Sequence, residues 1–201
     1  FKQVLAAGSR GLQPVSLHGE DIAFLQYTGG TTGISKGAML THRNLVANVL
    51  QCRAWHQQVP IEHATYFIAL PLYHIFSLTV NCLSMMKAGG KNILIPNPRD
   101  IGGFIKEISK LDYNLMTGVN TLYNALMNHA DFKSLEFRAP KIFVGGGMAV
   151  QEAVAKRWKQ MTGFTLLEGY GLTETSPCAT MNPLDLAEWN GSIGLPMPST
   201  D

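Results

Sequence analysis

The stretch that decides the fold is Tyr27-Thr28-Gly29-Gly30-Thr31-Thr32-Gly33-Ile34-Ser35-Lys36-Gly37. It follows an apolar run, Ala23–Tyr27, with the length and composition of a buried strand. Glycines allow a tight turn and bring backbone N–H groups up to an anion. The side-chain donors of the stretch are Thr28, Thr31, Thr32, Ser35 and Lys36. Many donors, few bulky side chains and one compact cation together predict a loop that binds phosphate groups.

Two common phosphate-binding patterns do not fit this chain. A Walker loop needs Gly-Lys followed by Ser or Thr. The loop has the reverse order, Lys36-Gly37, and the Gly-Lys pair at Gly90-Lys91 is followed by Asn92. The dinucleotide-binding pattern would need a glycine at Val150, after the glycines of Gly145–Gly147. The loop therefore belongs to another class of nucleotide-binding protein.

Short apolar runs alternate with segments of helical period along the chain. The predicted strands are Ala23–Tyr27, Thr65–Leu70, Asn92–Ile95, Leu115–Thr117, Ile142–Val144 and Thr165–Leu167. Helical faces are predicted within residues 45–50, 75–86, 104–111 and 150–161, with Asp100 as a cap of the third. This alternation predicts an α/β fold with a mostly parallel sheet flanked by helices. Ligands of such sheets bind beyond the carboxyl ends of the strands, where the glycine-rich and polar clusters fall.

The composition of the chain argues against several classes of function. The chain has 201 residues and a net charge of +2, so no strongly basic field indicates nucleic acid as a partner. Its three cysteines are scattered, which argues against a disulfide framework or a zinc site. The stretch His63–Met86 lacks charged residues but contains proline and several polar residues. We interpret it as a buried strand, a loop and a buried helix rather than as a membrane span.

Several motifs give this chain a resemblance to a known family. Tyr27–Gly37 resembles the phosphate loop of the adenylate-forming superfamily, which includes acyl-CoA synthetases and peptide-synthetase adenylation domains. Gly30 replaces the serine that is common in this loop, and Ser35 replaces the frequent proline. Both departures resemble the loops of bacterial long-chain acyl-CoA ligases. Further segments follow in the family's order: Pro71–Phe76, Gly145–Met148, Glu168–Glu174 and Gly191–Pro196. The resemblance runs from about Phe24 to Asp201 and implies part of the N-terminal domain of an acyl-CoA synthetase.

The resemblance implies roles for individual residues. His74 matches a histidine beside the reacting carboxylate and α-phosphate, Thr173 a contact to the α-phosphate, and Glu174 a carboxylate that binds Mg²⁺. Tyr170 offers a flat ring for adenine, and Glu168 is assigned a structural role. The implied nucleotide contacts are Thr28, Gly29, Gly30, Thr31, Thr32, Gly33, Ser35, Lys36, Gly145, Gly146, Gly147, Tyr170, Gly171 and Thr173.

Some assignments keep a structural alternative. On residue chemistry alone, His74 also fits a hydrogen-bonded core residue, and Gly145–Gly147 fits a tight turn between strand and helix. Gly118 and Val119 resemble the wall of the family's acyl pocket, but a plain buried helix accounts for that segment equally well.

The function implied is ATP-dependent activation of a long-chain fatty acid, first to an acyl-adenylate and then to a coenzyme A thioester, with Mg²⁺ as cofactor. An aryl- or medium-chain acyl-CoA ligase and a non-catalytic nucleotide-binding module are the alternatives. Residues 1–20 are interpreted as a lead-in segment and residues 21–201 as the ATP- and acyl-binding portion of the domain. A C-terminal lid domain of the full-length chain is expected beyond Asp201, so this piece is expected to be inactive alone. We expect a cytoplasmic location, with peripheral inner-membrane contact of the parent enzyme as an open alternative.

Overall fold

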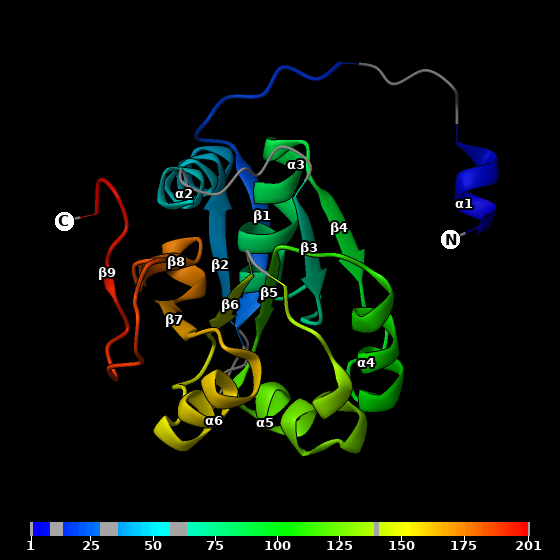
Figure 1. Ribbon diagram of the computed structural model, residues 1–201. Helices are drawn as coiled ribbons and strands as arrows, with labels where there is room; N and C mark the ends of the chain where they lie inside the picture. Colours follow the sequence, from blue (N-terminus) through cyan, green and yellow to red (C-terminus); the bar gives the residue numbers. More distant parts are fainter. Residues whose placement is uncertain (1, 9–13, 29–35, 57–63, 139–140, 201) are drawn as a thin grey trace.

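The computed structural model describes residues 2–8, 14–28, 36–56, 64–138 and 141–200, and it contains two sheets (Figure 1). Helices cover both faces of the larger sheet, as the alternating pattern predicts. The helical elements are α1 (Lys2–Ala7), α2 (His42–Trp55), η1 (Phe76–Leu83), α3 (Ser84–Ala88), α4 (Ile101–Lys110), α5 (Asn120–Asn128), η2 (Ala130–Ser134), α6 (Glu152–Thr162) and η3 (Thr173–Thr175).

The larger sheet has the strand order β4-β3-β5-β6-β7-β8-β9. Its strands are β3 (Thr65–Ile68), β4 (Lys91–Leu94), β5 (Leu115–Gly118), β6 (Ile142–Gly145), β7 (Leu166–Gly171), β8 (Cys178–Met181) and β9 (Leu195–Pro196). The pairs from β4 to β7 are parallel, whereas β8 and β9 add an antiparallel edge. The prediction of a mostly parallel sheet is therefore confirmed.

The first predicted strand is confirmed, but its expected place within the mostly parallel sheet is wrong. β1 (Ile22–Thr28) pairs antiparallel with β2 (Lys36–Thr41) in a separate sheet, with Tyr27 opposite Gly37 and Thr28 opposite Lys36. The reason is that β2 has one inward face, Ala38 and Leu40, which suits a half-exposed antiparallel ribbon. The predicted phosphate loop thus connects two antiparallel strands, and its residues 29–35 lie outside the described part of the chain.

Side chains alternate along the parallel strands and pack into a hydrophobic core on each face of the sheet. Phe67, Met116 and Phe143 point to one face, where they pack with residues of α4, α5 and α6 around Trp158. On the other face, Tyr66, Ile68 and Leu115 pack with Met85 of α3, and Val144 packs with Val80 of η1 and Cys52 of α2. Because both faces are buried, the strands read as continuous apolar runs.

The uncharged stretch before Met86 forms a strand, a turn and a helix, as interpreted from its sequence. Its helix begins as a π-helix, η1, and continues as α3. Asn81 is fully buried and donates from Nδ2 to Thr117 Oγ1 at 2.8 Å, which ties η1 to β5. In the described part of the chain, no helix combines the length and apolar character needed to span a bilayer.

The predicted cap of α4 is also confirmed. Asp100 Oδ1 accepts a hydrogen bond from Gly103 N at 2.9 Å, so it satisfies a backbone N–H group at the start of the helix. At the start of α2, Thr41 and Asn44 exchange side-chain and backbone hydrogen bonds in a capping box. This cap fixes the point where β2 turns into α2.

Candidate functional site

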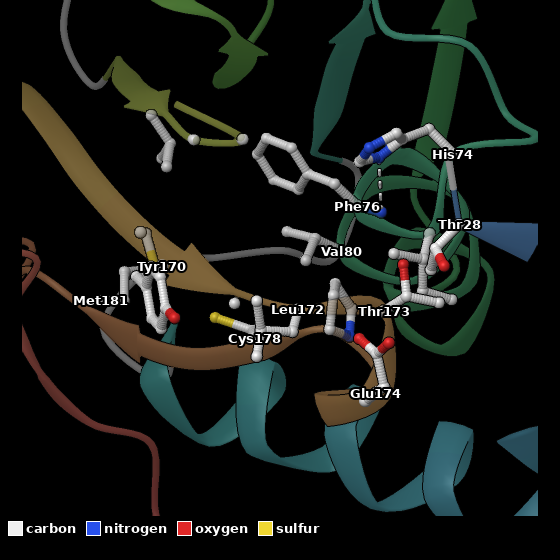
Figure 2. A pocket seen from close by; sticks show the side chains of 17 residues that line it. Thr28, His74, Phe76, Val80, Tyr170, Leu172, Thr173, Glu174, Cys178 and Met181 are labelled. Atoms are coloured by element: carbon white, nitrogen blue, oxygen red, sulfur yellow. Dashed lines mark hydrogen bonds between the residues drawn. The ribbon is translucent and has the colours of Figure 1, made fainter. Parts of the chain in front are cut away.

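One cavity, of about 340 Å³, lies where several of the predicted motifs meet (Figure 2). Its walls come from the end of β1, the turn before η1, the turn after β6, and the segment from β7 through η3 into β8. The residues that line it are Thr28, His74, Ile75, Phe76, Val80, Val144, Gly146, Gly147, Gly169, Tyr170, Gly171, Leu172, Thr173, Glu174, Pro177, Cys178 and Met181. Stretches far apart in the sequence therefore share one hollow.

The structure brings many of the sequence-predicted site residues together here. These are Thr28, His74, Gly146, Gly147, Tyr170, Gly171, Thr173 and Glu174. Gly29, Gly30, Thr31, Thr32, Gly33 and Ser35 lie outside the described residues. Lys36, Gly145, Gly118 and Val119 are described but do not line this cavity.

Each of these four residues neighbours a residue of the lining. Thr28 Oγ1 donates to Lys36 O at 3.4 Å, so Lys36 begins β2 directly beside the lining. Gly118 O accepts a hydrogen bond from Gly146 N at 3.1 Å, and a Cβ on Gly118 would meet Leu122 and Tyr123 at 3.1 Å. Gly118 and Val119 remain predictions as acyl-pocket residues.

His74 is held by its own backbone neighbours at the rim of the cavity. Its N–H donates to Pro71 O at 3.0 Å, and its Nδ1 accepts from Phe76 N at 3.2 Å (Figure 2). An imidazole nitrogen that accepts a hydrogen bond carries no proton, so the neutral ring is protonated at Nε2. His74 therefore offers an N–H donor to a ligand and also fixes the start of η1.

Three glycines of the lining are favoured by their surroundings, two by close approach of other atoms and one by its backbone conformation. A Cβ on Gly171 would lie 1.9 Å from Pro177 O, where β7 and β8 come together. A Cβ on Gly146 would lie 2.9 Å from the Phe76 ring. Gly147 also has a positive φ of 75°, which favours glycine. The glycine-rich walls thus leave a flat surface that side chains would otherwise fill.

The polar end of the cavity is formed by η3, a single turn of 3-10 helix. Its Thr173 is half-buried and its Glu174 is exposed, so the carboxylate is accessible to a ligand from solvent. No group of three His, Cys, Asp or Glu side chains that could hold a metal occurs in the described part of the chain. A single carboxylate fits Mg²⁺ that is bound mainly by phosphates and water.

Sequence reasoning missed the apolar wall that β8 contributes. Cys178 and Met181 line the cavity, and no motif pointed to either of them. Cys178 lies against the buried Cys52 of α2: their hydrogen bond lowers the pKa of the Cys178 thiol, and the same contact together with burial raises the pKa of Cys52. Both cysteines are free.

Comparisons with known proteins identify the family of this chain. A family model described as AMP-binding enzyme matches residues 2–201. A long-chain-fatty-acid–CoA ligase of Haemophilus influenzae is 50% identical over 205 residues, which covers 100% of this chain and 36% of the relative. A ligase of the same name from Salmonella typhimurium is 56% identical over 185 residues, covering 90% of this chain and 33% of the relative.

The fold comparison gives the same family. The ATP-bound structure of MatB from Rhodopseudomonas palustris superposes with a TM-score of 0.83 at 29% identity, covering 98% of this chain and 38% of that one. This chain therefore spans about a third of the length of the curated relatives it matches. The resemblance carried by the sequence motifs is confirmed, and the chain belongs to the AMP-binding enzyme family.

Proposed function

We propose that this chain forms the nucleotide site of an enzyme that activates a long-chain fatty acid with ATP and passes it to coenzyme A. The observation that carries the proposal is the convergence of Thr28, His74 and the Gly171–Glu174 segment on one cavity. The relatives at 50% and 56% identity are named for this activity, which supports the choice of substrate class.

The nucleotide would lie along the cavity. Tyr170, a residue that is 45% exposed, and the Gly146–Gly147 turn offer flat surfaces to an adenine ring. The phosphates would then extend toward Thr28 and Thr173, whose hydroxyl groups can donate hydrogen bonds. The loop of residues 29–35 follows Thr28 directly, so its donors would be added at the phosphate end.

In the first half-reaction, a fatty-acid carboxylate oxygen attacks the α-phosphorus of ATP. A new O–P bond forms as the bond to the bridging oxygen breaks, which gives acyl-adenylate and pyrophosphate. Two negatively charged groups must approach each other, so donors aimed at the phosphates are the main catalytic resource. The His74 Nε2–H group and the hydroxyl of Thr173 would serve this role, and Glu174 would hold Mg²⁺, which supplies positive charge.

In the second half-reaction, the coenzyme A thiol loses its proton to solvent and its sulfur attacks the acyl carbon, and AMP leaves with the electron pair of the broken C–O bond. This route needs no nucleophile from the protein, so Cys178 in the cavity wall has no assigned covalent role. We propose that the C-terminal domain of the full-length chain completes the site for these steps. We also propose a cytoplasmic enzyme with peripheral membrane contact, because fatty acids partition into bilayers.

The test is fatty-acid-dependent exchange of pyrophosphate into ATP by the full-length enzyme, followed by thioester formation. Palmitate should exceed octanoate and benzoate as substrate. Preference for benzoate or octanoate would support the aryl- or medium-chain alternative instead. Glu174→Ala should lower exchange by roughly a hundredfold or more, whereas the matched exposed variant Glu136→Ala should not. Unchanged exchange in Glu174→Ala would contradict the role given to this carboxylate.

A further inference from the structure

Glu168 is a buried carboxylate that no step of the proposed reaction uses. Its side chain belongs to β7, and the residue is only 5% exposed. Oε1 accepts a hydrogen bond from Val150 N at 2.8 Å, and Oε2 accepts from Trp189 Nε1 at 3.0 Å. Both partners are neutral donors, so the carboxylate forms no ion pair through these two bonds. Burial of a carboxylate is costly unless its oxygens are hydrogen-bonded, as they are here.

The backbone of Glu168 is fixed as firmly as its side chain. Glu168 N donates to Asn182 Oδ1 at 2.7 Å, and Asn182 N donates to Glu168 O at 2.8 Å. Asn182 is 1% exposed, and its own O accepts from Trp55 Nε1 at 3.0 Å. The residue is therefore a rigid point from which the carboxylate can hold a neighbouring segment.

That neighbouring segment is the glycine turn of the cavity. Gly145, where the turn begins, is the sheet partner of Glu168 in the β6–β7 pair. Val150, where the turn ends, donates its N–H to the Glu168 carboxylate. Between them lie Gly146 and Gly147, which line the cavity. One residue thus holds both ends of the turn.

Val150 is also packed tightly against the start of the turn. Its Cγ2 lies 2.4 Å from the position that a Cβ on Gly145 would take, and Val150 is 4% exposed. Val150 and Gln151 directly precede α6, and Gln151 N donates to Asn120 Oδ1 at 3.0 Å. The carboxylate therefore lies at the N-terminal end of α6, where the helix dipole favours negative charge.

β7 continues from Glu168 into the part of the cavity wall that contains Tyr170 and Thr173. We propose that Glu168 is a positioning residue for the nucleotide site: by holding Val150, it sets the gap between the glycine turn and the Tyr170 wall. This inference rests on the proposed function, because that gap is where adenine would lie. Glu168 acts through the turn and does not touch the nucleotide.

The experiment measures ATP affinity of the full-length enzyme by calorimetry in the presence of Mg²⁺. Glu168→Met keeps the length of the side chain but cannot accept the Val150 N–H, so the Kd for ATP should rise roughly tenfold. Glu168→Gln can turn its oxygen toward Val150 and should recover most of that loss. Trp189→Phe removes only the other hydrogen bond and should stay within about twofold of the wild-type Kd.

Thermal unfolding of the same variants separates positioning from stability. Glu168→Met leaves the N–H groups of Val150 and Trp189 unpaired in a buried place, so its unfolding midpoint should also fall. Its loss of ATP affinity should nevertheless exceed the loss that Trp189→Phe shows for the same drop in stability. If Trp189→Phe and Glu168→Met lose affinity in proportion to lost stability, Glu168 is merely structural and the inference is overturned. An unchanged Kd in Glu168→Met overturns it as well.

The outcome for the proposed function is read separately, from fatty-acid-dependent pyrophosphate exchange by the wild type. If the wild-type enzyme binds ATP but exchanges no pyrophosphate, the proposed function is contradicted. The role of Glu168 would then be judged from the ATP-binding data alone. Wild-type enzyme that does not bind ATP would overturn both.

Discussion

Asn48 and Cys178 are joined by a reciprocal pair of hydrogen bonds between α2 and β8. Asn48 Nδ2 donates to Cys178 O at 2.8 Å, and Cys178 N donates to Asn48 Oδ1 at 3.1 Å. The carboxamide thus takes the place of a sheet partner on one residue of β8, and that residue lines the cavity. Asn48 is 2% exposed, so both bonds are shielded from water.

Replacing Asn48 by alanine should lower the free energy of unfolding by about 2–4 kcal/mol, because two backbone groups of Cys178 lose their partner in a buried place. Urea denaturation measures this change. The exposed Asn124→Ala is the matched control and should stay within about 0.5 kcal/mol of the wild type. Equal stability of Asn48→Ala and the control would show that the pair does not hold β8 in place.

The thiols should react with iodoacetamide in a defined order. Hydrogen bonding with Cys52 lowers the pKa of Cys178, whereas that contact and burial raise the pKa of Cys52 well above its ordinary value. The thiolate is the reactive form, so Cys178 should be alkylated before Cys52. ATP with Mg²⁺ should slow the reaction of Cys178, which lines the cavity, but not that of Cys82. Peptide mass spectrometry reads each site, and faster labelling of Cys52 would contradict the geometry.

The two roles of His74 can be separated by one substitution. Asparagine at this position keeps an acceptor near the place of Nδ1 for the Phe76 N–H group, but it removes the Nε2 donor. His74→Asn should therefore retain the wild-type unfolding midpoint while pyrophosphate exchange falls by about a hundredfold. His74→Ala should lower both the unfolding midpoint and the rate of pyrophosphate exchange. Wild-type exchange in His74→Asn would mean that the ring serves only to start η1.

Gly171→Ala should be severely destabilising. The new Cβ would lie 1.9 Å from Pro177 O and 2.7 Å from Pro177 C, and backbone atoms cannot move aside as a flexible side chain can. We expect a loss of about 3 kcal/mol in the free energy of unfolding. Gly19→Ala is the control, since its Cβ would meet Arg43 Cβ at an ordinary 3.5 Å. Similar stabilities of the two variants in urea titrations would contradict the close approach of β7 and β8.

The free energy of unfolding should fall as the pH is lowered, because His56 is buried in its neutral form. The side chain is buried at the end of α2, with Nδ1 2.6 Å from Cys52 O and with Nε2 lacking a partner among the described residues. Burial lowers the pKa of His56 below its ordinary 6.5, with a further contribution from Arg53. The unfolded chain therefore binds a proton that the folded chain resists. Full stability is present above about pH 6.5 and is lost below it, by at most about 1.4 kcal/mol per pH unit.

Urea titrations between about pH 5 and pH 7 should show this loss in the wild type and in His18→Asn, which changes an exposed histidine. His56→Asn should show a smaller dependence on pH, because it removes the group that titrates. The same slope in all three proteins would exclude His56 as its source.

The larger part of the fold was predictable because its strands are buried on both faces. Runs such as Leu115–Thr117 and Ile142–Val144 are mostly apolar and lie between helical segments, so these strands could be located from the sequence. The edge strands β8 and β9 were not found. They have four and two residues, and long-range contacts such as Asn48 with Cys178 hold them rather than a local pattern.

In the candidate site too, residues in local motifs were predicted, whereas residues held by long-range contacts were not. Glycine-rich and polar motifs predicted Thr28, Gly146 and Thr173 as site residues, and the structure gathers them around one cavity. The pairing of β1 with β2 could not be read, because Lys36–Thr41 begins within the glycine-rich loop and does not read as an apolar run. Cys178 was missed because its place in the lining depends on α2, which lies far from it in the sequence.

The central claim is that these separate stretches bind one nucleotide. It is tested most directly by a crystal structure of the full-length enzyme with ATP and Mg²⁺. We predict adenine between Tyr170 and the Gly146–Gly147 turn, and phosphates between Thr28 and Thr173 with the metal beside Glu174. A nucleotide bound elsewhere, or an empty cavity at saturating ATP, would contradict the account.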